Sequence, residues 1–251
     1  MDFRKTFDKI PERFDKYRPR YCNELFQELE IVCELNSDKN VLEIGPGTGQ
    51  ATEPILKTGC NYTAIELGEN FTSLMKDKYS CYKNFHIVNA DFENYIFEEN
   101  KYDLVYSAAT IQWIPEEIAF TKIFKMLKPG GYLAMFMTRS DERSANPSLK
   151  DEINNVYNNF FHVEQKYNCR MQYENVLNYG FEDLKYKEWK KTRKLNAEEY
   201  ICYISTHCEH ITLKEPYKSN FYNGIRKVIH DAGNEIVITD TIPLYLVQKP
   251  L

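Results

Sequence analysis

The sequence lacks any apolar run long enough to cross a bilayer, and its N-terminus, Met1 to Lys5, has no apolar signal core. We therefore expect a cytoplasmic protein that does not enter a membrane. An excess of positive charge is absent too, since the formal net charge of the 251 residues is −5 and charges of both signs are interspersed. This balance leaves no electrostatic footprint for a nucleic-acid partner.

Cysteine pairs with metal-binding or redox spacing are also missing. The seven cysteines are an odd number without C-x-x-C spacing, which is typical of reduced and mostly buried thiols. Cys202, His207, Cys208 and His210 resemble a soft-metal cluster in composition alone, because their spacing matches no structural zinc pattern. We therefore predict no metal site.

What is present is enough apolar material for a folded core. Hydrophobic residues make up 43% of the chain and aromatic residues 14%. This composition excludes a disordered chain. The length suits one α/β domain with an elaboration or two small domains. The sequence contains no internal repeat and no low-complexity linker.

The segment Val41 to Gln50, VLEIGPGTGQ, organises the rest of the chain. Its β-forming residues lead into three glycines, and an amphipathic run from Ala51 to Lys57 follows. This order predicts a strand, a tight loop and a helix start. Glycine allows positive φ and close approach of a ligand, and a helix start offers N–H groups and partial positive charge. A nucleotide-like cofactor is the first hypothesis, with a purely structural βα turn as the alternative.

The spacing of these glycines bears on which cofactor is bound. A dinucleotide fingerprint needs a glycine where this chain has Gln50, so an NAD-binding loop fits badly. Gly45, Gly47 and Gly49 instead occupy alternate positions, and Glu43 precedes them by two. This E-x-G-x-G-x-G pattern resembles motif I of the class I S-adenosylmethionine (SAM) methyltransferases, in which the loop holds a methionine moiety and a ribose.

An acid at the end of the second predicted strand points to a ribose. The strand Tyr62 to Glu66 ends in Glu66, 21 residues after Gly45, the distance at which a carboxylate meets ribose hydroxyls across the neighbouring strand. A carboxylate can accept hydrogen bonds from both hydroxyls. The same chemistry serves SAM and NAD, and a solvated acid at a strand end is the alternative.

Later segments match the same family in order and spacing. Asp91 and Phe92 follow a predicted strand from Phe85 to Val88, at the positions that the resemblance to this family places near the adenine. The alternative for Asp91 is a simple N-cap role. A strand Tyr102 to Ser107 ends in small residues that leave room for a ligand. The Lys128-Pro-Gly-Gly turn before the strand ending at Phe136 is another recurrent family signature.

Residues 41 to 136 thus resemble the class I SAM-dependent methyltransferases, in particular the small-molecule branch (methyltransferase type 11) with trans-aconitate methyltransferase. The resemblance implies an α/β, Rossmann-like, seven-stranded and mostly parallel sheet whose last strand is antiparallel, with helices on both faces and a helical cap. SAM is then the cofactor and S-adenosylhomocysteine (SAH) the product. The implied cofactor-binding residues are Tyr17, Arg18, Glu43, Gly45, Pro46, Gly47, Gly49, Gln50, Glu66, Leu67, Asn89, Ala90, Asp91, Phe92, Ser107, Ala108 and Ala109.

Four segments follow from this interpretation. We expect an N-terminal helical lid over residues 1–36, in which the stretch Phe14 to Arg20 folds over the cofactor or merely packs on the sheet edge. The SAM-binding core covers residues 37–138. Residues 139–180 form a helical cap insertion, and residues 181–251 complete the sheet with a strand near Tyr186 to Lys194, two helices (197–207 and 217–231) and a last strand within 234–248.

The predicted reaction is methyl transfer to a small metabolite by in-line displacement. No Asn/Asp-Pro-Pro-Tyr/Phe or Pro-Cys follows the strand at 102–107, which argues against a nucleic-acid substrate. Gln112 is neutral and cannot act as a general base. Arginine would suit a carboxylate-bearing acceptor by bidentate pairing. An NAD-dependent oxidoreductase and a non-catalytic SAM-binding module are the alternatives, and a monomer or homodimer is expected. The candidates for acceptor positioning are Tyr17, Gln112, Trp113, Arg139 and Arg170.

Overall fold

The computed structural model describes residues 2–142, 146–167 and 171–251. The chain forms two compact units. The first, here the sheet unit, comprises Pro19–Thr138, Cys169–Trp189 and Ile242–Leu251. The second, here the helical unit, comprises Met1–Arg18, Arg139–Asn168 and Lys190–Thr241. The N-terminal segment 1–36 expected as one lid is therefore shared between the two units.

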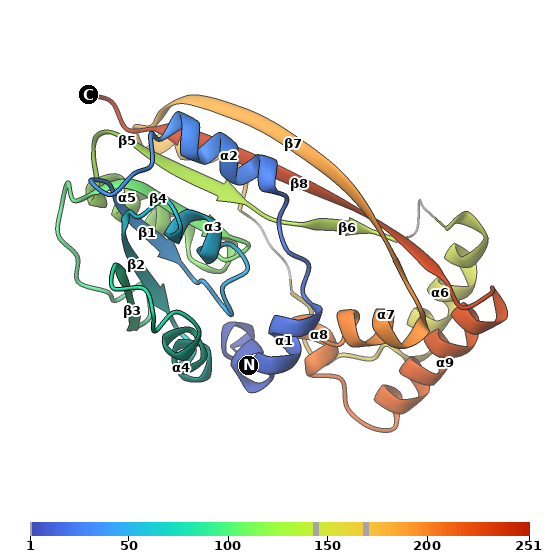
Figure 1. Cartoon of the computed structure of the whole chain (residues 1–251). Coiled ribbons are helices and arrows are strands. Elements are labelled where there is room, and N and C mark those ends of the chain that lie inside the picture. The colour runs from blue at the N-terminus through green and yellow to red at the C-terminus, as the bar shows by residue number, and fades with distance from the viewer. Residues whose placement is uncertain (1, 143–145, 168–170) are drawn as a thin grey trace. The chain divides into compact units, whose positions relative to one another are not determined.

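The sheet unit alternates strands and helices along the chain (Figure 1). Its complete elements are α2 (Asn23–Val32), β1 (Asn40–Ile44), α3 (Thr52–Leu56), β2 (Asn61–Glu66), α4 (Glu69–Lys78), β3 (Phe85–Asn89), β4 (Tyr102–Ala108), η3 (Ile111–Trp113), α5 (Glu116–Met126), β5 (Leu127–Phe136) and η4 (Tyr173–Tyr179). Strands β7 (Glu182–Leu195) and β8 (Ile236–Gln248) each contribute residues to both units.

The strand order in the sheet unit is β3-β2-β1-β4-β5-β8. Neighbours from β3 to β5 are parallel, and β8 runs antiparallel to β5, from Tyr132 opposite Gln248 to Phe136 opposite Leu244. The chain order reverses between β1 and β4, which is the switch point where open α/β sheets bind ligands. The expected Rossmann-like sheet with an antiparallel last strand is confirmed.

Residues on the two faces of these strands enter separate cores. Val41 packs with residues of α2, α3 and α4, whereas the next residue, Leu42, packs with residues of α5. The alternation follows from the period of two in a strand. Its consequence is that Glu43 lies on the same face of β1 as Val41, between the sheet and α3. Helices therefore cover both faces, as predicted.

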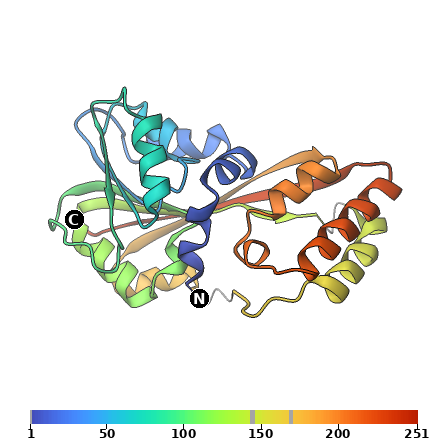
Figure 2. The same ribbon diagram turned by 90° about the horizontal axis from the view of Figure 1, so that it is seen from below.

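The helical unit contains η1 (Phe3–Lys5), η2 (Phe7–Lys9), α1 (Pro11–Tyr17), β6 (Arg139–Asp141), α6 (Pro147–Phe160), α7 (Ala197–Ile204), α8 (Cys208–Ile211) and α9 (Tyr217–Asp231). Figure 2 shows α6 and α9 side by side, and their apolar faces form one core with α7. Strand β6 pairs antiparallel with β8, where the buried carboxylate of Asp240 accepts hydrogen bonds from Ser140 and Arg193.

The number of strands differs from the expectation. The described residues form eight strands instead of seven, because the three-residue β6 pairs with β8 in a stretch predicted to be wholly helical. Helix α1 begins at Pro11, which occupies its first turn, and two short 3₁₀ helices precede it. Proline is tolerated there because the first N–H groups of a helix have no intrahelical acceptor.

Candidate functional site

The glycine loop, Gly45 to Ala51, joins β1 to α3. Gly45, Gly47 and Gly49 have φ values of +66°, +59° and +84°. A Cβ atom on Gly45 would lie 2.3 Å from Cγ2 of Thr110, and one on Gly49 would lie 2.7 Å from the Tyr79 hydroxyl. Both positions thus require glycine for backbone conformation and for space.

Three side chains hold the carbonyl groups of this loop from outside it. Thr110 Oγ1 donates to the Gly45 carbonyl oxygen at 3.0 Å, and Lys78 Nζ donates to that of Thr48 at 2.9 Å. The Tyr79 hydroxyl donates to the Gly49 carbonyl oxygen at 3.3 Å. Sequence analysis missed these three residues, because nothing in the pattern of α4 or of the segment after β4 connects them to the loop.

Glu66 lies at the carboxyl end of β2 and connects to the glycine loop. Its Oε2 accepts a hydrogen bond from the Gly47 N–H at 2.9 Å, and its Oε1 accepts one from the Gly68 N–H at 2.7 Å. The residue is 6% exposed. These two hydrogen bonds orient the carboxylate group beside the glycine loop.

Glu43, predicted to bind the cofactor, lies in a buried environment beneath the glycine loop. It is fully buried, and its Oε2 accepts hydrogen bonds from Thr52 Oγ1 at 2.6 Å and from the Tyr62 hydroxyl, which also contacts the Tyr106 hydroxyl. Burial raises the pKa of Glu43 to about 7, against the hydrogen bonds that lower it. Because Glu43 has no exposed surface, its contact with the glycine loop runs through Thr52 at the start of α3.

The predicted adenine segment lies at the carboxyl end of β3. Asn89 Nδ2 donates to the carbonyl oxygens of Glu66 and Leu67 at 3.0 and 3.2 Å. The N–H of Ala90 also donates to the Glu66 carbonyl oxygen, at 2.9 Å. These bonds hold the ends of β2 and β3 together.

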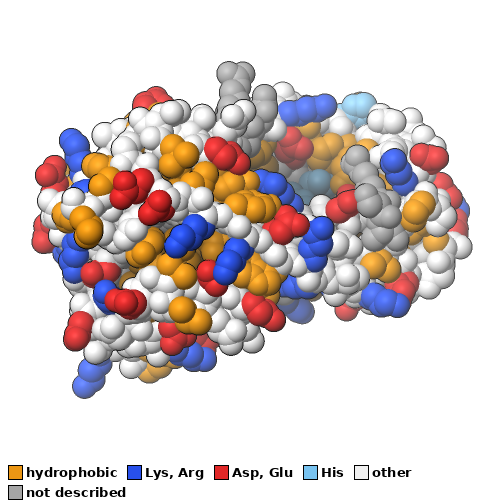
Figure 3. Space-filling view, turned by 90° about the horizontal axis from the view of Figure 1, so that it is seen from above, with side chains coloured by type: hydrophobic (Ala, Val, Ile, Leu, Met, Phe, Trp, Pro, Cys, Tyr) orange, Lys and Arg blue, Asp and Glu red, His pale blue; other side chains and the backbone are white. Residues whose placement is uncertain are grey.

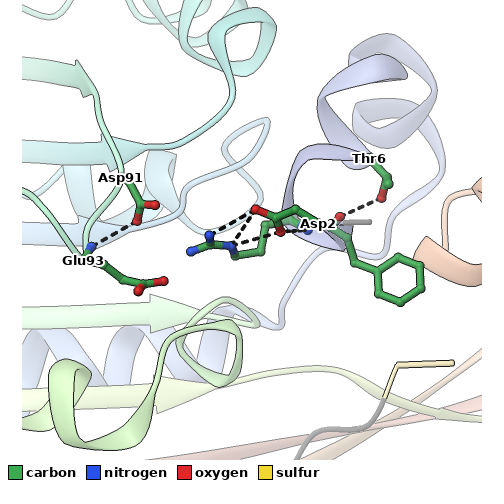
Figure 4. A network of polar contacts seen from close by, with 6 residues as sticks. Asp2, Thr6, Asp91 and Glu93 are labelled. Atoms are coloured by element: carbon green, nitrogen blue, oxygen red, sulfur yellow. Dashed lines mark hydrogen bonds and ion pairs between the residues drawn. The ribbon is translucent and has the colours of Figure 1, made fainter. Parts of the chain in front are cut away.

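Asp91 closes a turn rather than capping a helix. Its Oδ1 accepts a hydrogen bond from the Glu93 N–H at 3.0 Å (Figure 4). No helix follows in residues 92–101, which the structure describes throughout. Phe92 is 4% exposed and packs in the core with residues of α5. Its ring is thus largely covered by protein.

The segment after β4 has an unusual backbone. Ala109 has a φ of +59°, a left-handed conformation that residues other than glycine rarely adopt. The Gln112 side chain donates to the Ala109 carbonyl oxygen at 3.0 Å and accepts from the Tyr173 hydroxyl at 3.2 Å. Ser107 Oγ donates to the Ile44 carbonyl oxygen at 3.3 Å. Gln112 therefore supports the turn that follows Ala108.

The remaining predicted residues divide between the units. In the sheet unit, Gln50 donates to Thr48 Oγ1 at 2.6 Å, and Trp113 lies half-buried in η3. In the helical unit, Tyr17 ends α1, Arg139 begins β6, and the Arg18 guanidinium donates to the Thr206 carbonyl oxygen at 2.8 Å. The structure does not test the roles predicted for Tyr17, Arg18 and Arg139. Arg170 lies outside the described residues.

The residues proposed and rejected as a metal cluster lie in α7, α8 and the turn between them. Within residues 2–142, 146–167 and 171–251, no group of three or more His, Cys, Asp or Glu side chains could hold a metal ion. Burial lowers the pKa of His210 to about 3, and its Nε2 lies 3.1 Å from the Tyr157 hydroxyl. No helix in this described part of the chain is long and apolar enough to cross a membrane.

The glycine loop, Glu66 and Asp91 follow successive parallel strands at the carboxyl edge of one sheet. The Gly47 N–H donates to the Glu66 carboxylate, which this bond orients, and Asp91 follows β3. This set of donors and acceptors fits a nucleoside with hydroxyls and an amino group. This arrangement at the carboxyl edge of the sheet is the one expected from the resemblance to class I methyltransferases.

Comparison with known proteins supports this assignment. Residues 42–135 match a family described as "Methyltransferase domain". It is 31% identical over 140 residues to a malonyl-[acyl-carrier protein] O-methyltransferase of Marinomonas sp. (strain MWYL1), covering 54% of this chain and 51% of that protein. It is 30% identical over 158 residues to malonyl-[acyl-carrier protein] O-methyltransferase 2 of Ilyobacter polytropus, covering 58% and 60%. The chain thus spans about half to three fifths of these relatives.

Solved structures show the same fold. A putative type II methyltransferase from Anaeromyxobacter dehalogenans superposes with a TM-score of 0.66 at 16% identity, covering 94% of this chain and all of that one. A phosphoethanolamine N-methyltransferase 2 from Haemonchus contortus, solved with S-adenosyl-L-methionine, gives 0.57 at 16% identity, covering 97% of this chain and 57% of that one. The predicted class I methyltransferase fold is confirmed.

Proposed function

We propose that this protein is a SAM-dependent methyltransferase that transfers a methyl group to a small, carboxylate-bearing acceptor. The observation that carries the proposal is the buried carboxylate of Glu66, which accepts the Gly47 N–H and so lies against the glycine loop of a methyltransferase domain. Bound SAM would supply an electrophilic methyl group on a sulfonium, with SAH as the product.

The sheet unit provides the residues for the nucleoside. Glu66 accepts hydrogen bonds from the ribose hydroxyls, and the loop of Gly45, Gly47 and Gly49 accommodates the methionine moiety without Cβ atoms. Asp91 accepts from the adenine amino group. The left-handed Ala109 turns the chain sharply after β4, so that Ala108 and Ala109 leave space beside the reacting centre.

The acceptor residues need only bind, orient and exclude water. A carboxylate acceptor attacks as the anion and requires no general base, so the neutral Gln112 is compatible with the reaction. Tyr17 and Arg18 belong to the segment predicted to fold over the cofactor as a lid. Trp113 and Arg139 are the residues predicted to position the acceptor. Arg139 would pair with the acceptor carboxylate.

The relatives favour an oxygen acceptor. Both O-methyltransferases named above act on a malonyl group on an acyl-carrier protein, according to their names. A malonyl thioester carries one free carboxylate, the class of acceptor that the sequence analysis favoured. Lys, Arg, Asp and Glu side chains are interspersed over the face that Figure 3 shows, which does not suit a nucleic-acid backbone as the acceptor.

Calorimetry tests the cofactor. Purified protein is titrated with SAH and, separately, with NAD. Binding of SAH without NAD is expected, whereas NAD binding alone would replace the proposal by the oxidoreductase alternative. Binding of neither compound would also overturn it.

Transfer of label tests the reaction and the acceptor. The protein is incubated with SAM labelled in its methyl group and with malonyl-pantetheine, malonyl-acyl-carrier protein or free malonate. Label that is released by mild base as methanol indicates a methyl ester, and comparison of the three acceptors separates free from carrier-bound substrates. A protein that binds SAH but labels none of them, nor any compound of a metabolite extract, is a binding module only.

A further inference from the structure

Lys122, on α5, makes three hydrogen bonds to one irregular segment. Its Nζ donates to the carbonyl oxygens of Phe92, Glu93 and Tyr95 at 2.7, 3.0 and 2.8 Å. An ammonium group has three N–H donors. All three are therefore directed to the β3–β4 loop, residues 90–101, which contains the predicted adenine-contacting residues.

The same ammonium group lies over two aromatic rings of this loop. Nζ is 5.2 Å from the ring centroid of Phe92 and 5.4 Å from that of Phe97. These distances are within the range of cation–π attraction. The methylene chain of Lys122 thus reaches into the apolar layer beside α5 while its charge stays against carbonyl groups and rings.

Charge complementarity adds to this arrangement. Burial lowers the pKa of Lys122, while the nearby carboxylates of Asp91 and Glu93 act in the opposite direction. The lysine charge and the two carboxylates therefore attract one another.

The β3–β4 loop has no regular secondary structure between its ends. The structure describes all residues from 90 to 101, and none of them belongs to a helix or strand. The next strand, β4, begins at Tyr102. Two backbone hydrogen bonds, from Asn94 to Asp91 and from Tyr95 to Phe92, define the turn that follows Asp91, whereas the N–H groups of Asn100 and Lys101 donate to the carbonyl oxygens of Lys125 and Met126 at the other end of the loop. The contacts of Lys122 join this turn to α5.

We infer that Lys122 is a positioning residue for the adenine base: it fixes the β3–β4 loop so that Asp91 meets the exocyclic amino group. The inference rests on the proposed function and deepens it. Lys122 touches neither base nor sugar in this scheme, and it acts through the loop alone.

The test compares two ligands and four proteins. Calorimetry measures the Kd of SAH and of the SAH analogue whose base is purine, which lacks the 6-amino group. The proteins are the wild type, Lys122→Met, Lys122→Arg and the control Lys125→Met, an exposed lysine three residues further along α5. Methionine keeps an apolar chain under the rings but has no donor. Arginine keeps the charge and should preserve folding, but its planar fork cannot reproduce three converging bonds.

We expect Lys122→Met to weaken SAH binding about tenfold, the loss of one well-aligned hydrogen bond to a charged group, and to change the affinity for the purine analogue by less than about twofold. Lys122→Arg should give an intermediate loss, and Lys125→Met none. The preference for SAH over the purine analogue thus decreases in the Lys122 variants.

Two results would overturn the inference. One is an unchanged SAH affinity in folded Lys122→Met. The other is an equal loss for both ligands in Lys122→Met and Lys122→Arg, which would mean that the lysine acts on general folding. If the wild type binds neither SAH nor the analogue, the proposed function itself has failed, and the inference falls with it.

Discussion

At the scale of single residues, two glutamates with the same chemistry have opposite environments. Glu66 accepts two backbone N–H groups at the carboxyl edge of the sheet. Glu43 is enclosed by hydroxyl groups, and its Oε1 has no hydrogen-bond partner. Both were predicted from the sequence to bind the cofactor, and of the two only Glu66 contacts the backbone of the glycine loop directly.

The Glu66→Ala substitution should weaken SAH binding by roughly 1–3 kcal/mol, because ribose hydroxyls and the Gly47 N–H would lose a charged acceptor. Calorimetry with SAH measures the change. Glu69→Ala, at an exposed residue of the first turn of α4, is the matched control and should bind normally. An unaltered affinity in folded Glu66→Ala would contradict the ribose contact.

Glu43 should make stability depend on pH. In the unfolded chain its carboxyl group ionises near the ordinary pKa of 4.5, whereas in the folded protein the pKa is about 7. The folded state therefore retains a proton that the unfolded state has released, so the free energy of unfolding falls as pH rises from 4.5 to about 7 and is level above that.

Urea unfolding of the wild type and Glu43→Gln checks this prediction. Between about pH 4.5 and about pH 8, the free energy of unfolding of the wild type should fall by on the order of 3 kcal/mol relative to that of Glu43→Gln, because the amide does not titrate. Glu69→Gln, at an exposed position, should follow the wild type. Parallel profiles for the wild type and Glu43→Gln would show that Glu43 ionises in the folded state as it does in the unfolded one.

Sequence pattern predicted part of this site for identifiable reasons. The glycine loop follows from three glycines at alternate positions, which adopt a backbone that other residues avoid. The face of Glu43 also follows from the sequence, since strand alternation groups it with Val41. Its partners Tyr62 and Tyr106 lie on other strands and leave no local signal. Lys122 likewise looks like an ordinary polar residue of an amphipathic helix.

At the scale of elements, long sequence patterns were sufficient to predict strands and helices, whereas short patterns were not. Strands β1 to β5 were predicted because each has a run of β-forming residues bounded by turn residues. Strand β6 has three residues and exists through its pairing with Thr239 to Thr241 of β8, so no window of local sequence could reveal it. Tertiary pairing decides such elements.

The turn from β1 into α3 allows a prediction that separates backbone strain from crowding. Gly45→Ala introduces a Cβ at positive φ and 2.3 Å from Thr110, whereas Gly59→Ala introduces one at a φ of +86° with no atom closer than 3.9 Å. We expect Gly59→Ala to lower the free energy of unfolding by about 1 kcal/mol through the positive φ alone. Gly45→Ala should lower it further and should also abolish SAH binding. Urea unfolding and calorimetry give both quantities. Equal stability of the two variants would mean that Thr110 moves aside readily.

At the scale of the whole molecule, the two units hold different parts of the predicted site. The glycine loop, Glu66, Asp91 and Gln112 belong to the sheet unit, and Tyr17, Arg18 and Arg139 belong to the helical unit. The sequence resemblance covers mainly the first set, because the match to a methyltransferase domain ends at residue 135. Of the residues predicted to position the acceptor, Tyr17 and Arg139 therefore lie outside this match.

Hydrogen exchange with and without SAH tests how far the site extends. SAH at about 100 times its Kd should stabilise the folded state by about 2.7 kcal/mol, since it binds only that state. Amide exchange should slow in residues 45–51, 66–68 and 89–95, whose N–H and carbonyl groups hold the proposed nucleoside contacts.

Amide exchange should also slow in residues 14–20 if the predicted lid closes over the cofactor, whereas the exchange of α9 should not change. Slowing in the sheet unit without any effect at residues 14–20 would contradict the lid and retain the cofactor site. Slowing in neither segment, with SAH bound by calorimetry, would move the nucleoside to another part of the chain.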